Sequence, residues 1–289
     1  MGKVPTYKFH IVGAAPTPLR DAFHTFLRIP WPAALGMLVG AWLVLNAIFA
    51  LGYVFTGGLE NARPGSYWDA YIFSVQTMGT IGYGAIYPKG TGAHILVDVE
   101  AVTSLICTAL ATGLVFSKFA RSNARIAFSE KACITLQDGQ PTLMIRFGNE
   151  RGNRIVDTEM RIAYSFRRDT AEGVSMYRLI DLKLGRDHAP ALARSFTITH
   201  VIDEESPLYG KAPAQLKDEE TELMVTVVGL DDVTSQTVHA SFVYEDHEIV
   251  FGARHADLLS TLPNGDIQVD LTKFHAVVPT KRTADFPYP

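Results

Sequence analysis

The stretch QTMGTIGYGAIYP, residues 76–88, contains more glycine than a turn requires and lies between two strongly apolar segments. Glycine accepts backbone angles that other residues resist, so glycines that alternate with other residues let successive carbonyl groups point the same way. A column of such carbonyls replaces the water shell of a cation. We therefore predict a cation-binding filter at residues 80–84. Its members are Thr80, Ile81, Gly82, Tyr83 and Gly84.

The two flanking segments are long enough to cross a membrane. Residues 33–55 contain no charged side chain, and about 20 apolar residues suffice for a transmembrane helix. Residues 95–118 form a second apolar run, which carries Asp98 and Glu100 near its start. Because an acid inside a membrane is costly, we expect both acids to face protein and not lipid. The sequence thus predicts an outer helix at 33–55 and an inner helix at 95–118, within a pore domain of residues 31–120.

A short helix is predicted directly before the filter. Ser66 and Asp69 match a capping box, and the apolar residues that follow keep helical spacing over residues 67–78. A helix of this length is too short to span, so it forms a re-entrant segment with the filter. Irregular backbone at membrane depth is tolerated only inside protein or along a water-filled path. The partly negative C-terminal end of this helix favours a cation nearby.

Basic residues set the expected orientation. Two arginines precede the first span and three basic residues follow the second, whereas the loop between the spans holds only Arg63 and Lys89. By the positive-inside rule both termini are cytoplasmic, in a multi-pass protein of the plasma (inner) membrane. The flanking basic residues are Arg20, Arg28, Lys118, Arg121 and Arg125.

The N-terminal 30 residues are predicted to include an interfacial helix. Leu19, Ala22, Phe23 and Phe26 keep helical apolar spacing, which favours an amphipathic helix at the membrane surface. Together, the five flanking basic residues form a belt suited to anionic lipid headgroups. Anchoring by the positive-inside effect accounts equally well for each of these residues taken singly.

One face of the inner helix is a candidate gate. At 100° per residue, Leu105, Thr108, Thr112 and Phe116 fall within an arc of about 80°. One chain supplies one carbonyl to each ring of ligands, so several copies are needed, most simply a cyclic tetramer. Four Phe116 rings at the converging helix ends would then close the pore by excluding water. The alternative is that Phe116 only packs against its neighbours or lipid.

Residues 121–289 show a different pattern, with short runs rich in Val, Ile, Thr, Phe and Tyr. Asp138-Gly139 and Asn264-Gly265 are hairpin signals, so an antiparallel β-sandwich is expected. The β-like runs are 142–147, 159–166, 195–202, 222–228, 237–244 and 267–271.

The charge and the motifs exclude other classes of function. The net charge of −4 gives no nucleic-acid signature. No catalytic or metal-binding spacing is present, so we expect a protein that is not an enzyme, with K⁺ as its ion and no organic cofactor.

Five stretches of the sequence resemble the inward-rectifier potassium channels, in particular their prokaryotic KirBac-type branch. These stretches are ENARPGSYWDAYIFSVQTMGTIGYG, GLVFSKFAR, TLMIRFGNER, DLKL and SFTITHVIDEESPLYG. T-I-G-Y-G differs from the potassium-channel filter T-V-G-Y-G only by Ile for Val. The resemblance implies a homotetrameric two-helix pore on a ring of immunoglobulin-like β-sandwiches. It also implies that residues 229–236 line the cytoplasmic pore.

Three departures from the family stand out. Many eukaryotic members have a Glu–Arg salt bridge behind the filter, and the matching residues here are Gln76 and Ile86. An upper hinge glycine corresponds to Ser104, whereas Gly113 remains. Strong rectifiers carry an acid at the position of Thr108, so the resemblance implies only weak block by polyamines or Mg²⁺.

Two other functions remain possible from the sequence. A nonselective cation channel of the same fold is disfavoured by the filter tyrosine and glycines. A non-conducting, membrane-anchored β-sandwich that binds a partner is disfavoured by the re-entrant segment, because a simple anchor needs none.

Overall fold

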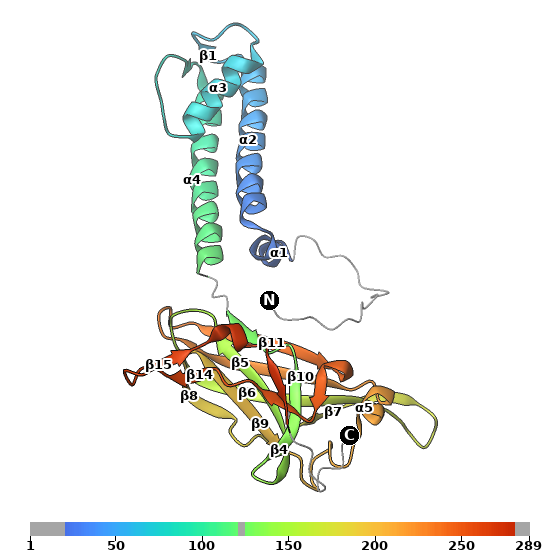
Figure 1. Ribbon diagram of the computed structural model, residues 1–289. Helices are drawn as coiled ribbons and strands as arrows, with labels where there is room; N and C mark the ends of the chain where they lie inside the picture. Colours follow the sequence, from blue (N-terminus) through green and yellow to red (C-terminus); the bar gives the residue numbers. More distant parts are fainter. Residues whose placement is uncertain (1–20, 121–124, 281–289) are drawn as a thin grey trace. The chain divides into compact units, whose positions relative to one another are not determined.

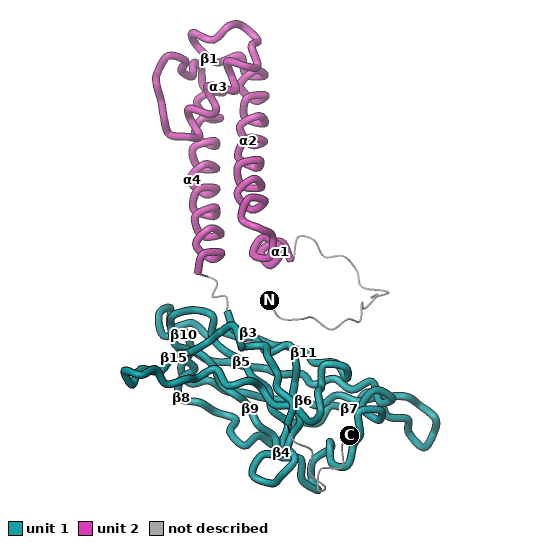
Figure 2. The backbone as a smooth tube through the Cα atoms, in the orientation of Figure 1, with its two compact units in different colours: residues 1–10, 122–289 teal, residues 11–121 magenta. Residues whose placement is uncertain are grey.

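The computed structural model describes residues 21–120 and 125–280. The chain divides into two compact units, within residues 11–121 and within residues 122–289 (Figure 2). Two of the predicted lipid-binding residues, Arg20 and Arg121, lie outside the described residues.

The pore unit is built from helices. Figure 1 shows α2 and α4 side by side, with the short α3 packed near the ends of both that lie farthest from α1. β1 and β2, which flank α3 in the sequence, pair as a two-stranded antiparallel sheet. The elements are α1 (Ala22–Arg28), α2 (Trp31–Thr56), β1 (Leu59–Glu60), α3 (Tyr67–Met78), β2 (Tyr87–Pro88) and α4 (Thr91–Phe119).

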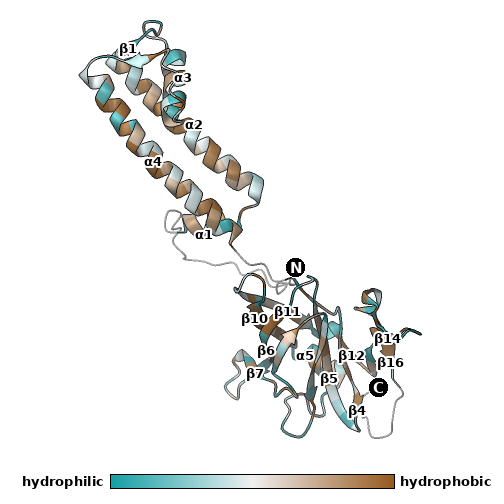
Figure 3. Ribbon diagram, turned by 90° about the vertical axis from the view of Figure 1, so that its left-hand side faces the viewer, coloured by the Kyte–Doolittle hydropathy of each residue, from teal (hydrophilic) through white to brown (hydrophobic). Residues whose placement is uncertain are grey.

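Helices α2 and α4 are both long and apolar enough to cross a membrane, and the ribbon in Figure 3 is coloured as hydrophobic over much of both helices. Only 17% and 11% of the residues in their most apolar windows are buried within the chain. Apolar surface on this scale requires lipid or further protein around it. α4 begins four residues before the predicted start, directly after Gly90, whose φ of 83° breaks the preceding backbone.

The second unit is a β-sandwich. One five-stranded sheet has the order β11-β10-β6-β7, with β8 also paired to β6. The other has the order β12-β4-β5-β3, with β9 also paired to β5. The bounds are β3 (Ile126–Phe128), β4 (Ala132–Gln137), β5 (Gln140–Asn149), β6 (Ile155–Asp169), β7 (Ser175–Asp181), β8 (His188–Leu192), β9 (Ser195–Val201), β10 (Glu222–Asp231), β11 (Thr237–Glu245) and β12 (Ile249–Phe251).

Short elements complete this unit, and apolar side chains from both sheets fill one core between them. Phe147 and Ile145 from one sheet and Ile162, Leu223 and Val225 from the other are fully buried. The short elements are α5 (Pro213–Asp218), η1 (Asp246–Glu248), β13 (Ala253–His255), β14 (Leu259–Thr261), β15 (Ile267–Val269), η2 (Leu271–Lys273) and β16 (Val277–Pro279).

The predicted all-β character of this unit is confirmed, and each of the six predicted runs overlaps a strand. Asp138 and Gly139 both have positive φ, at 51° and 81°, as the tight β4–β5 hairpin requires. The sequence reading missed β7, because all of its side chains are exposed and show no apolar alternation. The six predicted runs also omit β4, whose mostly buried side chains show little alternation, β8, and several strands of only three residues.

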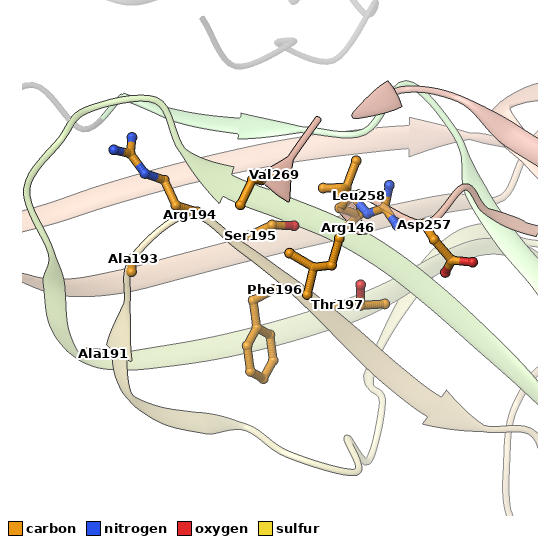
Figure 4. A pocket seen from close by; sticks show the side chains of 11 residues that line it. Arg146, Ala191, Ala193, Arg194, Ser195, Phe196, Thr197, Asp257, Leu258 and Val269 are labelled. Atoms are coloured by element: carbon orange, nitrogen blue, oxygen red, sulfur yellow. The ribbon is translucent and has the colours of Figure 1, made fainter. Parts of the chain in front are cut away.

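Arg146 of β5 ties the sandwich to the segments after β13. Its guanidinium is buried and donates to the carbonyls of Ala256 at 2.7 Å and of Phe274 at 3.5 Å. Figure 4 shows Arg146 beside Leu258 and Asp257, at the edge of a pocket of about 550 Å³. Asp257 forms its own ion pair with Arg254 at 3.0 Å. Arg146 therefore acts as a buried cross-link between distant segments.

His255 lies beside this cross-link and is buried. Its Nε2 is 3.3 Å from the carbonyl oxygen of Met144, and its Nδ1 is 3.9 Å from the Cys133 sulfur. Burial, with the neighbouring Arg146 guanidinium, lowers the pKa of His255 to about 4. The folded domain therefore holds a neutral imidazole that donates from Nε2.

A buried neutral histidine makes stability depend on pH. The unfolded chain takes up this proton near pH 6.5, whereas the folded chain does so only near pH 4. The contribution of His255 to the free energy of unfolding is therefore complete above pH 6.5. It falls as the pH drops toward 4, by up to about 3 kcal/mol. We expect His255→Gln to weaken this loss. Hydrogen exchange at β4 and β5 in the detergent-solubilised full chain measures it at pH 7 and 5.

The matched control for this prediction is His239→Gln, because His239 is exposed. The pKa of buried His200 is also lowered, by desolvation, and this residue is common to all three proteins. Equal pH dependence in the parent and the His255 variant would contradict the assignment.

Candidate functional site

The segment after α3 has an alternating backbone. Thr80, Gly82 and Gly84 have φ values of 53°, 60° and 77°, whereas Ile81 and Tyr83 between them do not have positive φ. A threonine with positive φ is uncommon. Strict alternation over five residues is foreign to helix, strand and ordinary turn, and it brings successive carbonyl groups to one side of the chain.

The carbonyl groups of this segment are unpaired in the structure. Among the described residues, no hydrogen bond has a carbonyl oxygen of residues 80–84 as its acceptor. The amide groups behave differently, since those of Ile81 and Gly82 donate to the Gln76 carbonyl at 2.8 and 3.3 Å. The segment is thus fastened through its donors and keeps its acceptors free, which is an arrangement suited to a cation.

Helix α3 delivers the segment to its place. Ser66 caps the helix, since its Oγ accepts from the Asp69 amide at 3.2 Å, and the helix spans Tyr67–Met78, the range that the capping box and apolar spacing predict. The backbone amides of Gly79 and Thr80 donate to the carbonyls of Val75 and Thr77 in the last turn of α3. These bonds join the end of the helix to the candidate filter. The negative end of the helix therefore lies at the start of the candidate filter.

The loops around the segment add contacts that the sequence reading did not find. Asn61 donates from Nδ2 to the carbonyl of Ala85, the residue that follows the filter, at 3.0 Å. Arg63 holds the Asp69 carboxylate through two side-chain bonds of 2.9 and 2.7 Å. Exposed pairs of this kind add little stability, but they fix the loop that carries Asn61. Nothing in the local sequence marks Asn61 as a partner of Ala85.

The candidate gate residues share an exposed face of α4. Leu105, Thr108, Thr112 and Phe116 are all exposed in the single chain, and Phe116 shows 70% of its surface. Glu100 and Ser104, which lie to one side of this face on the helix, are buried within the chain. The predicted face is therefore free to meet other copies, water or lipid.

Of the two acids in α4, only Glu100 lies against protein within the chain. Glu100 is fully buried, whereas Asp98 is exposed. The expectation that both acids face protein therefore fails for Asp98 in the single chain. The two residues are two positions apart and point to different sides of the helix.

The basic residues have different environments. Lys118 is buried, and its Nζ donates to the carbonyls of Phe26, Leu27 and Ile29 at 3.0, 3.1 and 2.6 Å. All three ammonium hydrogens are thus engaged by the C-terminal end of α1, which leaves none for a lipid. Arg28 and Arg125 are exposed.

Residues 229–236 form the end of β10 and its turn into β11. Asp231 holds this turn, since its Oδ1 accepts from the amides of Val233 and Thr234, both at 3.0 Å. A bulge at Gly229 interrupts the pairing of β10 with β6. Val233 projects from the turn with 75% of its surface exposed.

No cluster of three or more histidine, cysteine or acidic side chains that could hold a metal occurs among residues 21–120 and 125–280. Within these ranges, the backbone carbonyl groups of residues 80–84 offer several consecutive oxygen atoms that accept no hydrogen bond.

Comparison with known proteins agrees with these features. A family model described as "Ion channel" matches residues 37–121, and one described as "Inward rectifier potassium channel C-terminal domain" matches residues 126–286. The chain is 38% identical over 260 residues to "Inward rectifier potassium channel Kirbac3.1" of Paramagnetospirillum magnetotacticum, covering 90% of this chain and 88% of the relative.

Animal relatives are longer. The chain is 30% identical to "Inward rectifier potassium channel irk-1" of Caenorhabditis elegans, covering 93% of this chain and 54% of that protein. It is 31% identical to "G protein-activated inward rectifier potassium channel 1" of Homo sapiens, covering 91% and 57%. With both family models matched in order along one chain, this protein belongs to the inward rectifier potassium channel family.

Proposed function

We propose that this protein conducts potassium across a membrane, with residues 80–84 as the selectivity filter. The observation that carries the proposal is the column of unpaired carbonyls with alternating φ at Thr80, Gly82 and Gly84. The potassium named in the relatives' descriptions agrees with it. Flux of K⁺ against Na⁺ into liposomes tests it, and it also separates a selective channel from a nonselective or non-conducting protein.

The active form is a cyclic homotetramer. In the single chain, Ile81 and Tyr83 expose 51% and 76% of their surfaces, although buried surroundings are needed to hold irregular backbone at membrane depth. Neighbouring copies would cover these side chains and complete each ring of carbonyls. The exposed apolar surfaces of α2 and α4 favour the same assembly.

The gate lies at the cytoplasmic end of α4, where Phe116 projects from the exposed face. Both termini are cytoplasmic, and the family resemblance makes residues 229–236 candidates for lining the cytoplasmic part of the pore. Anionic lipids act through the exposed Arg28 and Arg125, together with Arg20 and Arg121. Lys118 is left out of this lipid belt, because α1 already occupies its ammonium group. K⁺ flux with and without anionic lipid measures this dependence.

Replacing a filter glycine should remove selectivity. At Gly82 or Gly84 an added Cβ meets no neighbouring atom in the chain, so the cost comes from positive φ, which would turn the carbonyls away from the ion. We expect Gly82→Ala tetramers to lose their preference for K⁺ over Na⁺ in liposome flux. Gly65→Ala is the matched control, because Gly65 has φ 69° outside the filter. A parental preference in Gly82→Ala would show that the filter lies elsewhere.

Removing the aromatic ring of Phe116 should favour the open pore. Alanine would widen the lower constriction and weaken the exclusion of water, so open probability should rise while ion preference stays unchanged. Single-channel recording in planar bilayers is the measurement. Leu110→Ala serves as control, since Leu110 is comparably exposed but lies off the predicted face. If Phe116→Ala leaves open probability unaltered, the gate belongs to another segment, with residues 229–236 next in order.

The cavity should bind internal spermine weakly. Thr108 offers a hydroxyl group where an acid would attract a polycation, and no acid lies between Ala101 and Phe116. We expect Thr108→Asp to tighten the block by about tenfold or more, because about 1.4 kcal/mol of added attraction suffices. The voltage dependence of the spermine block should also become steeper. Thr108→Asn is the uncharged control, and recordings from inside-out patches measure both the strength and the voltage dependence of the block. Tight, steep block in the parent would contradict the prediction.

A further inference from the structure

A polar cluster is buried between α2, α3 and α4, behind the candidate filter. Its members are Asn46 and Tyr53 of α2, Ser74 of α3 and Glu100 of α4, and each exposes 1% of its surface or less. Because Glu100 is fully covered within one chain, no neighbouring copy can reach it. Among residues 21–120 and 125–280, no lysine, arginine or histidine forms a salt bridge with Glu100.

The orientation of the Asn46 amide is fixed by its neighbours. Nδ2 lies 2.8 Å from the carbonyl oxygen of Trp42 and 3.3 Å from the Met78 sulfur. Both of these atoms can only accept, so the nitrogen must face them. The flipped amide would set two oxygen acceptors 2.8 Å apart. Oδ1 of Asn46 therefore points at Ser74, whose Oγ is 3.0 Å away, and needs a proton from it.

Ser74 has one hydroxyl proton and two oxygen neighbours. Its Oγ is 3.0 Å from Asn46 Oδ1 and 2.5 Å from Glu100 Oε1. If the proton goes to Asn46, the contact with Glu100 is a hydrogen bond only when the carboxyl group donates. If Glu100 is ionised, the single Ser74 proton can be donated either to Asn46 Oδ1 or to Glu100 Oε1. One of these two buried oxygens is then left without a hydrogen bond.

The protonated acid satisfies every member of the cluster. Tyr53 donates to Glu100 Oε2 at 2.5 Å, Glu100 donates from Oε1 to Ser74, and Ser74 donates to Asn46. Asn46 then donates to Trp42. Each polar hydrogen then has an acceptor, and Glu100 Oε2, Ser74 Oγ and Asn46 Oδ1 each receive a hydrogen. No charge is placed inside the membrane, where an unpaired carboxylate is costly.

The cluster reaches the filter through Met78, the last residue of α3. Asn46 donates to the Met78 sulfur, and Ser104 of α4 donates from Oγ to the Met78 carbonyl at 2.6 Å. α3 is therefore held at Ser74 and again at Met78, two residues before Thr80. The salt bridge that braces the filter in many eukaryotic relatives is absent here, because Gln76 and Ile86 occupy the matching positions.

We propose that Glu100 is a neutral carboxylic acid that donates its proton to Ser74 and thereby braces the pore helix and filter from behind. It is a positioning residue for ion selectivity, since it touches neither the ion nor the carbonyl column. The proposal rests on the assignment of residues 80–84 as the filter. It requires a proton on Glu100 at neutral pH, which can be observed directly.

Infrared spectroscopy of the reconstituted full-length tetramer at pH 7 provides that observation. The difference spectrum between the parent and Glu100→Gln should contain the C=O stretch of one protonated carboxylic acid, shifted in D₂O. A carboxylate band in its place would overturn the proposal. This measurement does not depend on ion conduction. It therefore tests the protonation of Glu100 separately from the filter assignment, which Gly82→Ala tests.

Selectivity variants test the role of the proton. Glutamine accepts from Tyr53 and donates to Ser74 as the neutral acid does, so Glu100→Gln should keep the parental ratio of K⁺ to Na⁺ flux. Glu100→Met and Ser74→Ala cannot make the Glu100–Ser74 hydrogen bond, and each should lower the ratio by about tenfold, the effect of losing one hydrogen bond of ordinary strength. Size-exclusion chromatography establishes that each variant is tetrameric. If Glu100→Gln loses selectivity as fully as Glu100→Met, a negative charge is needed and the proposal fails.

Discussion

Carbonyl groups that lack hydrogen-bond donors at membrane depth are the constraint on which this protein depends. In the hydrocarbon region each unpaired backbone group costs several kcal/mol, so only helices and closed barrels normally cross it. Residues 80–84 break that rule, with no donor for their carbonyls among the described residues. Under the proposed assignment as a filter, cations would replace the donors and neighbouring copies would enclose the segment. Ion binding and assembly into a ring would then be conditions of the fold as much as functions of it.

Enclosure by itself does not hold such a segment, because apolar contacts between helices in lipid gain little over contacts with lipid itself. Polar contacts supply the specificity instead. The amides of the filter are fastened to Gln76, the end of α3 to Ser104, and the loop beyond the filter to Asn61. Each of these bonds joins elements separate in the chain or fixes the exit from a helix. A rigid filter then requires no charged group behind it, provided that a complete network of neutral groups replaces one.

The sequence predicted what depends on local pattern and missed what depends on tertiary contact. The bounds of α3 follow from Ser66, Asp69 and the apolar spacing, all of which are local signals. The alternating glycines predicted carbonyl groups that point the same way, but the positive φ of Thr80 is seen only in the structure. By contrast, the partners of Lys118 come from a helix about 90 residues earlier, and its charge alone suggested lipid. Glu100 was recognised as an acid that must face protein, but its partners Tyr53 and Ser74 lie on two other helices and only the fold brings them together.

Lys118 and Glu100 show the same principle at the two ends of α4. Both are ionisable side chains buried within one chain, and both exhaust their hydrogen-bonding capacity on neighbouring helices, Lys118 on α1 and Glu100 on α2 and α3. Displacing either end of α4 from its neighbours would expose several strong polar groups at once. The low-cost motion is therefore one in which α1 travels with the lower end of α4, while the upper end stays fixed to α3. A helix that is anchored above and coupled below can move Phe116 without disturbing Thr80. With the gate and filter assigned as we propose, this would separate opening of the pore from selection of the ion.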